Sequence, residues 1–290
     1  MRQSRRMGLI YGDESIGDTR YLKFSANSDG TLNAFVEEVY ANDGDLPENG
    51  THTDGYWYIK DIEYTGTASW TKTANSTFTV PETGVYQVQI IGSGGGGGGG
   101  AGGNGTTTGQ NWYIFGGPGG GGGGAGYVTI VLLALTKNTT HSITIGSAGA
   151  KGNKGTVDYG TGNAGKAGGN GNATKFGTFS SQGGTGGEGG EKADYTHSTY
   201  ASGGEGGVLN GKEGSNTSRV KVTSSSSDTT TAGGSGGSGG TNGTSYGKGG
   251  SGGNGGQCKY YKEDAEYTAS AGTDGSAGTK GAVIIKKMTY

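Results

Sequence analysis

Residues 85–100 read Val85-Tyr-Gln-Val-Gln-Ile-Ile-Gly-Ser-Gly-Gly-Gly-Gly-Gly-Gly-Gly100, and this stretch decides the fold. In its first half, Tyr86, Val88 and Ile90 alternate with glutamines, which is the period of a β-strand with one apolar and one polar face. Its second half ends in seven consecutive glycines. A strand that passes directly into glycine predicts a β framework joined to a glycine-dominated region.

Glycine makes up 71 of the 290 residues, about 24% against a usual share of ~7%. Several tracts place it at every third position, as in Gly146, Gly149, Gly152 and Gly155. The polyproline II helix has three residues per turn, so such a tract would carry a stripe without side chains along one side. Backbones could touch along this stripe, with N–H groups of one helix meeting carbonyl groups of its neighbours.

We therefore expect a bundle of polyproline-II-type (polyglycine II) helices. The alternative is a flexible Gly/Ser linker, but linkers rarely keep a period. Tracts with glycine at two positions in three, such as 183–190, could be surrounded by other helices. Tracts with glycine at one position in three should lie at the edge, with their side chains directed outward.

Six short strands are predicted around these tracts. They span residues 77–80, 85–91, 127–135, 142–145, 176–181 and 282–287. The residues 136–140 are typical of a hairpin between the third and fourth strands. So few apolar residues can cover only one modest sheet or sandwich. The predicted fold class is mostly β, a small antiparallel framework that holds a polyglycine II bundle with very little α-helix.

The distribution of glycine predicts two domains. Residues 1–91 contain 9 glycines and residues 92–290 contain 62. Residues 20–62 have an ordinary density of apolar side chains, with turns expected at Asp29-Gly30, Asp43-Gly44 and Glu48-Asn49-Gly50. Within them, residues 32–40 fit either a helix or a strand. We interpret 1–62 as a small β-rich module and 63–290 as a glycine-rich domain with interspersed loops.

Charge and hydropathy argue against nucleic acid and membranes as partners. The net charge is −2, from 22 basic and 24 acidic residues, so no strong field attracts a polyanion. No apolar run approaches the ~18 residues of a membrane span. The basic N-terminus meets Gly12-Asp13-Glu14 before any apolar core develops, so it is not typical of a signal peptide.

No motif points to catalysis, a metal or a cofactor. Residues 160–167 and 206–213 nearly match a phosphate-binding loop, but both lack the closing Ser or Thr. Carboxylate pairs such as Glu263-Asp264 are typical of a solvated surface. His52, His141, His197 and the single Cys258 are widely separated in the sequence and lack the spacing of metal ligands. We therefore expect a protein that is not an enzyme, with no catalytic residue, metal or cofactor.

Aromatic residues interrupt the glycine tracts at 110–115, 194–200 and 257–267. Helices made of glycine offer no pocket for a Tyr side chain, so we expect these inserts to form loops at an end of the bundle, where aromatic rings make good contact surfaces. The alternative is that they cap the sides of the bundle. The candidate receptor-binding residues are Trp112, Tyr113, Tyr195, Tyr200, Tyr260 and Tyr261.

From Phe78 onward, the chain resembles the glycine-rich domain at the ends of bacteriophage tail fibres and tail adhesins. The matching stretches are Phe78-Thr-Val-Pro-Glu-Thr-Gly-Val-Tyr-Gln-Val-Gln-Ile-Ile91 before poly-Gly, Gly124-Ala-Gly-Tyr127, Ser142-Ile-Thr-Ile-Gly146, Thr174-Lys-Phe-Gly-Thr-Phe179 and Gly281-Ala-Val-Ile-Ile285. One departure is the apolar stretch 128–135, which replaces a short polar strand start. More faintly, residues 45–58 resemble a short element of tail proteins from phages of Gram-positive bacteria.

The resemblance implies a virion protein at the tail tip or fibre end that binds a host surface receptor, made in the host cytoplasm without a signal peptide. Its partners would be a bacterial surface polysaccharide or protein, and other phage tail or baseplate proteins. We expect residues 1–62 to mediate attachment, most simply as a homotrimer. Two alternatives are a purely structural tail or cell-surface protein and an ice-binding protein. Ice binding needs repeated Thr, Ser or Ala on one face, whereas these tracts are broken by Tyr, Lys and Glu.

Overall fold

The computed structural model describes residues 19–26, 32–41, 51–53, 55–60, 69–82, 84–108, 111–158, 161–192, 200–223, 225–264 and 266–287. These residues form mostly β structure in small antiparallel sheets, without an α-helix. Accordingly, the described part contains no helix long and apolar enough to cross a membrane. The mostly β prediction is confirmed.

The N-terminal part of the chain forms a four-stranded sheet with the order β2-β1-β4-β3. Its strands are β1 (Thr19–Ala26), β2 (Leu32–Ala41), β3 (Thr51–Thr53) and β4 (Tyr56–Lys60). The region that fits either a helix or a strand is therefore a strand, β2, paired along its length with β1. The expected turns at 29–30, 43–44 and 48–50 lie outside the described residues.

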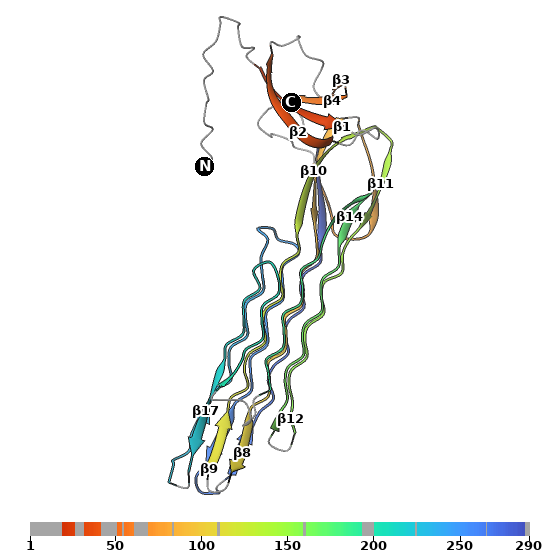
Figure 1. Cartoon of the computed structure of the whole chain (residues 1–290). Coiled ribbons are helices and arrows are strands. Elements are labelled where there is room, and N and C mark those ends of the chain that lie inside the picture. The colour runs from red at the N-terminus through yellow and green to blue at the C-terminus, as the bar shows by residue number, and fades with distance from the viewer. Residues whose placement is uncertain are drawn as a thin grey trace, which may run out of the picture.

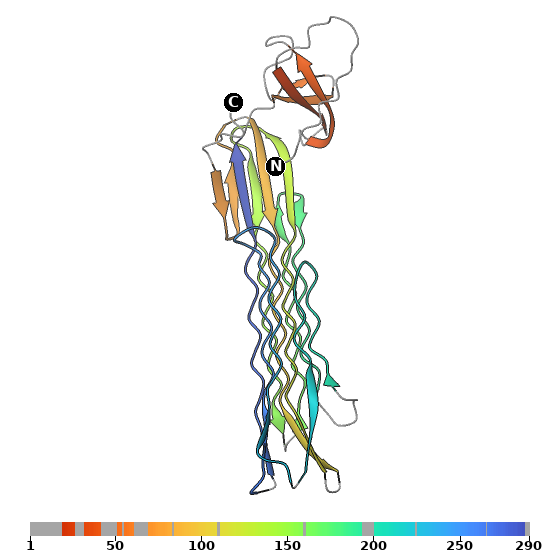
Figure 2. The ribbon, with the colours of Figure 1, turned by 90° about the vertical axis from the view of Figure 1, so that its left-hand side faces the viewer.

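Two four-stranded sheets form a sandwich beside this first sheet (Figures 1 and 2). One has the order β10-β7-β21-β5, with β5 (Ser69–Lys72), β7 (Gly84–Ile91), β10 (Val128–Leu135) and β21 (Ala282–Lys287). The other has the order β15-β14-β11-β6, with β6 (Ser76–Thr79), β11 (Thr140–Thr144), β14 (Thr174–Phe176) and β15 (Phe179–Ser181).

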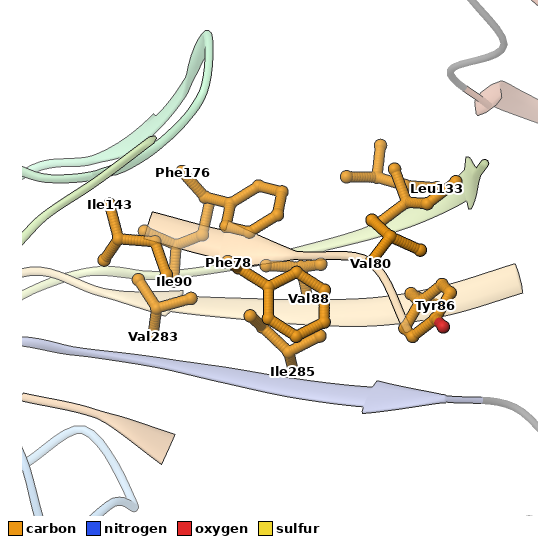
Figure 3. Packing of buried hydrophobic residues seen from close by; sticks show 11 residues of the cluster. Phe78, Val80, Tyr86, Val88, Ile90, Leu133, Ile143, Phe176, Val283 and Ile285 are labelled. Carbon is orange, nitrogen blue, oxygen red and sulfur yellow. The ribbon is translucent and has the colours of Figure 1, made fainter. Parts of the chain in front are cut away.

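The apolar core of the sandwich lies between these two sheets (Figure 3). Tyr86, Val88 and Ile90 of β7 are fully buried, as the alternation in the sequence predicts. They face Phe78 of β6 and Phe176 of β14, whose ring centroids are 6.4 Å apart. Burying each such side chain contributes about 1.5–3 kcal/mol, so this small core is what stabilises the framework.

The strand prediction is incomplete, because it lacks β5 and the sheets at the far end of the bundle, and two of its details are wrong. Residues 176–181 do not form one strand: β14 and β15 form a hairpin, because Gly177 adopts a φ of +55° that reverses the chain. Residues 136–140 do not close a hairpin either. β10 pairs with β7 while β11 pairs with β6 and β14, so this connection passes from one sheet of the sandwich to the other.

Ten extended glycine-rich segments lie side by side between the sandwich and the far end of the molecule (Figures 1 and 2). We number them in chain order as segments 1 (92–103), 2 (116–126), 3 (146–156), 4 (163–173), 5 (182–192), 6 (202–207), 7 (211–216), 8 (232–242), 9 (247–257) and 10 (270–281). They contain neither strand nor helix hydrogen bonding, and backbone hydrogen bonds join each segment to its neighbours instead.

The backbone N–H groups of segment 1 turn from one neighbour to the next with every residue. Gly96 donates to Gly169 in segment 4, Gly97 to Ser276 in segment 10, and Gly98 to Gly121 in segment 2, each at 2.9 Å. Gly99 then returns to segment 4. The direction of the hydrogen bonds therefore repeats after three residues.

The carbonyl groups of segment 1 follow the same rotation and accept N–H groups from segments 3, 5 and 9. Segment 1 is thus bonded to six others. Segment 2 is likewise bonded to six: it donates to segments 5, 7 and 9 and accepts from segments 1, 6 and 8. The eight outer segments form a ring around segments 1 and 2. Each is hydrogen-bonded to the next in chain order, from segment 3 to segment 10, and segment 10 is hydrogen-bonded to segment 3. This pattern gives three layers: segments 4-5-6, segments 3-1-2-7 and segments 10-9-8.

Residue size decides which segments lie inside. Segments 1 and 2 are buried throughout and contain almost only glycine at all three positions of the repeat. Segment 5 has glycine at two positions in three, and side chains at its remaining position, such as Glu188, are exposed. The expectation that two glycines in three suffice for a surrounded segment is therefore wrong. Segment 3 has one glycine in three and lies at the edge with Lys151 and Lys154 exposed, as predicted.

Candidate functional site

The end of the bundle opposite the sandwich carries a second set of small sheets, which we call the tip (Figures 1 and 2). One sheet has the order β16-β17-β9-β8 and another β18-β19-β20, and β12 and β13 form a hairpin. The strands are β8 (Asn104–Thr108), β9 (Asn111–Phe115), β12 (Val157–Asp158), β13 (Thr161–Gly162), β16 (Tyr200–Ala201), β17 (Thr217–Val222), β18 (Thr229–Thr231), β19 (Cys258–Tyr261) and β20 (Glu266–Ala269).

The tip has its own apolar core. Ile114, Val222, Cys258 and Tyr260 are buried together, and Trp112 packs against them with its ring centroid 5.7 Å from that of Tyr260. On the other face of β9, a second small cluster contains buried Phe115 and Ala201 with partly buried Tyr113. The residues 111–115 therefore form a strand covered on both faces, and not the loop that the sequence suggested.

The position of Gly105 shows how β8 approaches β20. A side chain at this residue would overlap the ring of Tyr267, which lies directly against the backbone of β8. Nearby, burial raises the pKa of the Cys258 thiol from 9.0 to about 11, so the thiol is protonated at neutral pH. Both features indicate that the tip interior is closely packed.

The structure brings five of the six predicted site residues to the tip. Trp112 and Tyr113 are on β9, Tyr200 on β16, and Tyr260 and Tyr261 on β19. Tyr195 lies outside the described residues. Tyr260 needs a correction, because its side chain is 0% exposed and cannot touch a receptor. Its neighbour Tyr261 points the other way, as successive strand residues do, and is partly exposed.

Basic side chains rest on two of the partly exposed tyrosines. The Arg219 guanidinium lies 4.8 Å from the ring centroid of Tyr113, and Lys259 Nζ lies 4.2 Å from that of Tyr261. Such cation–π contacts restrict the rings, contributing about 0.5–1 kcal/mol at exposed sites. The tip therefore presents aromatic rings in defined orientations.

A surface hollow of about 460 Å³ lies beside Tyr261. It is lined by Ser227, Asp228, Tyr261, Lys262, Glu263 and Asp264. Asp228 Oδ1 accepts the backbone N–H of Lys262 at 3.0 Å, and its Oδ2 lies 3.8 Å from Lys259 Nζ. Apart from Tyr261, sequence reasoning missed this set. Its only local signal is the charged stretch 262–264, which resembles any solvated turn.

A second distinctive surface is the layer of segments 10, 9 and 8. Hydroxyl groups of Ser270, Thr273, Ser276 and Thr279 in segment 10 accept the outward N–H groups of segment 9 at 2.6–2.8 Å. Asn254 Oδ1 in segment 9 does the same for Gly236 in segment 8 at 2.9 Å. With Ser235 and Ser238 exposed next to them, this layer presents hydroxyl and amide groups in a repeat of three residues.

The described residues contain no group of three or more His, Cys, Asp or Glu side chains that could hold a metal ion. Among known proteins, the family model of the Glycine-rich domain matches residues 71–287. The chain therefore belongs to the Glycine-rich domain family over the sandwich, the bundle and the tip. No curated protein matches the chain.

Proposed function

We propose that this Glycine-rich domain protein is a bacteriophage tail-fibre or tail-tip adhesin, which binds a receptor on the host cell surface through its tip without enzymatic activity. The observation that carries the proposal is the gathering of Trp112, Tyr113, Tyr200 and Tyr261 at the end of the bundle farthest from the N-terminal sheet. Aromatic side chains with few rotamers are enriched where proteins bind their partners.

The two ends of the molecule suit two tasks. The sheet formed by β1 to β4 lies beyond the sandwich, and the tip lies at the opposite end of the bundle (Figure 2). We propose that residues 1–62 join the virion through other tail or baseplate proteins, as a homotrimer, so that the tip faces the host. The receptor would be a bacterial surface polysaccharide or protein.

We further propose that the ten segments are polyglycine II helices. The support is the three-residue rotation of their backbone hydrogen bonds, which equals the three residues per turn of this helix type. A bundle cross-linked in this way would be a stiff spacer. Stiffness matters for an adhesin because it holds the tip at a set distance from the virion.

Binding to cells tests the adhesin function. Purified full-length protein should bind intact host cells and extracted surface glycans. Alanine at Tyr261, which is partly exposed and outside the two buried clusters of the tip, should weaken binding at least tenfold, because a hot-spot residue of an interface contributes ~2 kcal/mol or more. Tyr127→Ala is the control, since this tyrosine is 44% exposed at the sandwich end. Equal loss in the control, or no cell binding, would favour a purely structural protein. Release of sugars or peptides from cells would contradict a non-enzymatic role.

One observation favours a second candidate function, ice binding. The layer of segments 10, 9 and 8 carries exposed Ser, Thr and Asn, and its charged side chains are Lys248, Asp274 and Lys280. Tyr, Lys and Glu interrupt the tracts in the sequence, but in the fold they fall mainly on other faces. Thermal hysteresis in a solution of the purified protein would support this function, and its absence would exclude it.

A further inference from the structure

We infer that the hollow beside Tyr261 binds a neutral saccharide unit. The inference rests on the proposed function, because it names the kind of host ligand that the tip would recognise. The hollow measures about 460 Å³, within the range of ~300–1,000 Å³ that small-molecule sites occupy. It lies at the ends of β18 and β19 that point away from the bundle, where a cell-surface chain could reach it.

Charge selects against acidic glycans. Asp228, Glu263 and Asp264 place three carboxyl groups around the hollow, against the single ammonium group of Lys262 in its lining. The ammonium group of Lys259 contacts the Tyr261 ring and lies 3.8 Å from Asp228, so it offsets that carboxylate and leaves Glu263 and Asp264 against Lys262. An anionic sugar or a phosphate would meet a net negative lining and be repelled.

The carboxylates that line the hollow can accept hydrogen bonds from the hydroxyl groups of a sugar. Ionised carboxylates are pure hydrogen-bond acceptors, and a bond to a charged acceptor is about twice as strong as a bond between neutral groups. Asp228 is held in place by the N–H of Lys262 at 3.0 Å, so it is already oriented before a ligand arrives.

Tyr261 supplies the apolar part of the site. Its side chain is partly exposed, and Lys259 Nζ, 4.2 Å from the ring centroid, restrains it. A sugar ring has C–H groups on its faces and hydroxyls at its rim. An aromatic ring next to carboxylates matches both the C–H groups and the hydroxyls, whereas a purely apolar peptide side chain would offer no donor to Glu263 or Asp264.

Titration of the full-length protein with soluble oligosaccharides tests the inference. The probes are neutral oligomers of glucose, galactose or N-acetylglucosamine, cationic glucosamine oligomers and anionic glucuronate oligomers. At least one neutral probe should bind, with an affinity that changes less than about twofold between 50 and 500 mM salt, since uncharged ligands are not subject to ionic screening. Tyr261→Ala and Asp228→Asn should each weaken it at least tenfold, whereas Tyr127→Ala should leave it unchanged.

Glu263→Gln and Asp264→Asn provide variants at exposed turn positions, whose folding is not at risk. Together they should weaken neutral-sugar binding and improve binding of the glucuronate probe. Two results would overturn the inference. One is tighter binding of the glucuronate or glucosamine probe than of any neutral probe by the unmodified protein, and the other is an affinity for the neutral probe that none of the four tip substitutions changes. If host cells are bound but none of the neutral probes is, the saccharide inference fails while the adhesin function stands. If neither cells nor sugars are bound, both fail.

Discussion

The backbone N–H of Gly98 donates to the carbonyl oxygen of Gly121 at 2.9 Å, and this bond joins the two segments at the centre of the bundle. The carbonyl oxygen of Gly98 accepts the N–H of Gly253, so this residue also joins segment 1 to segment 9. A side chain at Gly98 would overlap the carbonyl group of Glu188. At Gly98 the centre of the bundle is therefore packed backbone against backbone, and this position has no room for a methyl group.

Gly98→Ala should accordingly destabilise the bundle severely. The added Cβ would force segment 5 away from segment 1 and break hydrogen bonds on either side, so we expect a loss of about 3 kcal/mol or more, the upper part of the range for overpacked cores. Thermal unfolding measures the loss. Ser238→Ala is the matched control on exposed segment 8 and should stay within about 0.5 kcal/mol of the unmodified protein. Equal stability of the two variants would contradict close backbone packing.

Tyr260 allows a sharper test of the tip core. Its hydroxyl is buried and has no hydrogen-bond partner in the described part of the chain. Tyr260→Phe should therefore leave stability unchanged or raise it by up to about 1–3 kcal/mol. Tyr260→Ala should lower it by about 3–5 kcal/mol, because a large ring next to Trp112 is lost. Thermal unfolding of the two variants checks both, and destabilisation by the Phe variant would mean that the hydroxyl is satisfied.

Cys258 predicts a specific pH dependence. Burial raises the pKa of its thiol from 9.0 to about 11. The unfolded chain therefore releases the thiol proton at lower pH than the folded chain does. The contribution of the protonated thiol to the free energy of unfolding is complete below pH 9 and is lost between pH 9 and about 11. At pH 8, a thiol reagent should label the unfolded protein and spare the native one. Fast labelling of the native protein would show that the tip opens readily.

The proposed helix type predicts the circular dichroism spectrum. Polyglycine II segments with small sheets should produce a polyproline-II-like spectrum with some strand contribution and no strong helical bands. Hydrogen exchange should protect the amides of segments 1 and 2 most, since both are buried and bonded on all sides. A helical spectrum, or unprotected amides throughout, would argue against the bundle.

Removal of residues 1–62 tests the attachment role. The sheet formed by β1 to β4 pairs only within itself among the described strands, so the truncated protein should keep the sandwich, bundle and tip. It should still bind host cells but no longer incorporate into virions or form trimers, as measured by electron microscopy and analytical ultracentrifugation. Incorporation of the truncated protein would refute the attachment role and leave the function of the tip unaffected.

Local pattern predicts much of this protein. The alternation of Tyr86, Val88 and Ile90 predicts a strand with a buried face, and the structure has β7 with these three side chains in the core. The three-residue period of glycine predicts extended segments with one stripe against their neighbours, because the spacing follows from the number of residues per turn. For the same reason, the edge position of segment 3 could be read from Gly149, Gly152 and Gly155.

Contacts between residues that are far apart in the sequence are determined only by the tertiary structure. Nothing near Tyr260 and Tyr261 in the sequence tells which of the two is buried; Trp112, almost 150 residues earlier, decides it by packing on one face of β19. The hollow likewise needs Asp228 beside Tyr261, and the hydroxyl layer needs segments 8, 9 and 10 to lie next to one another in this order. The glycine content and its three-residue period determine that glycine backbones must pack together. Which segments become neighbours depends on hydrogen bonds between residues far apart in the chain, and the local sequence does not specify these pairs.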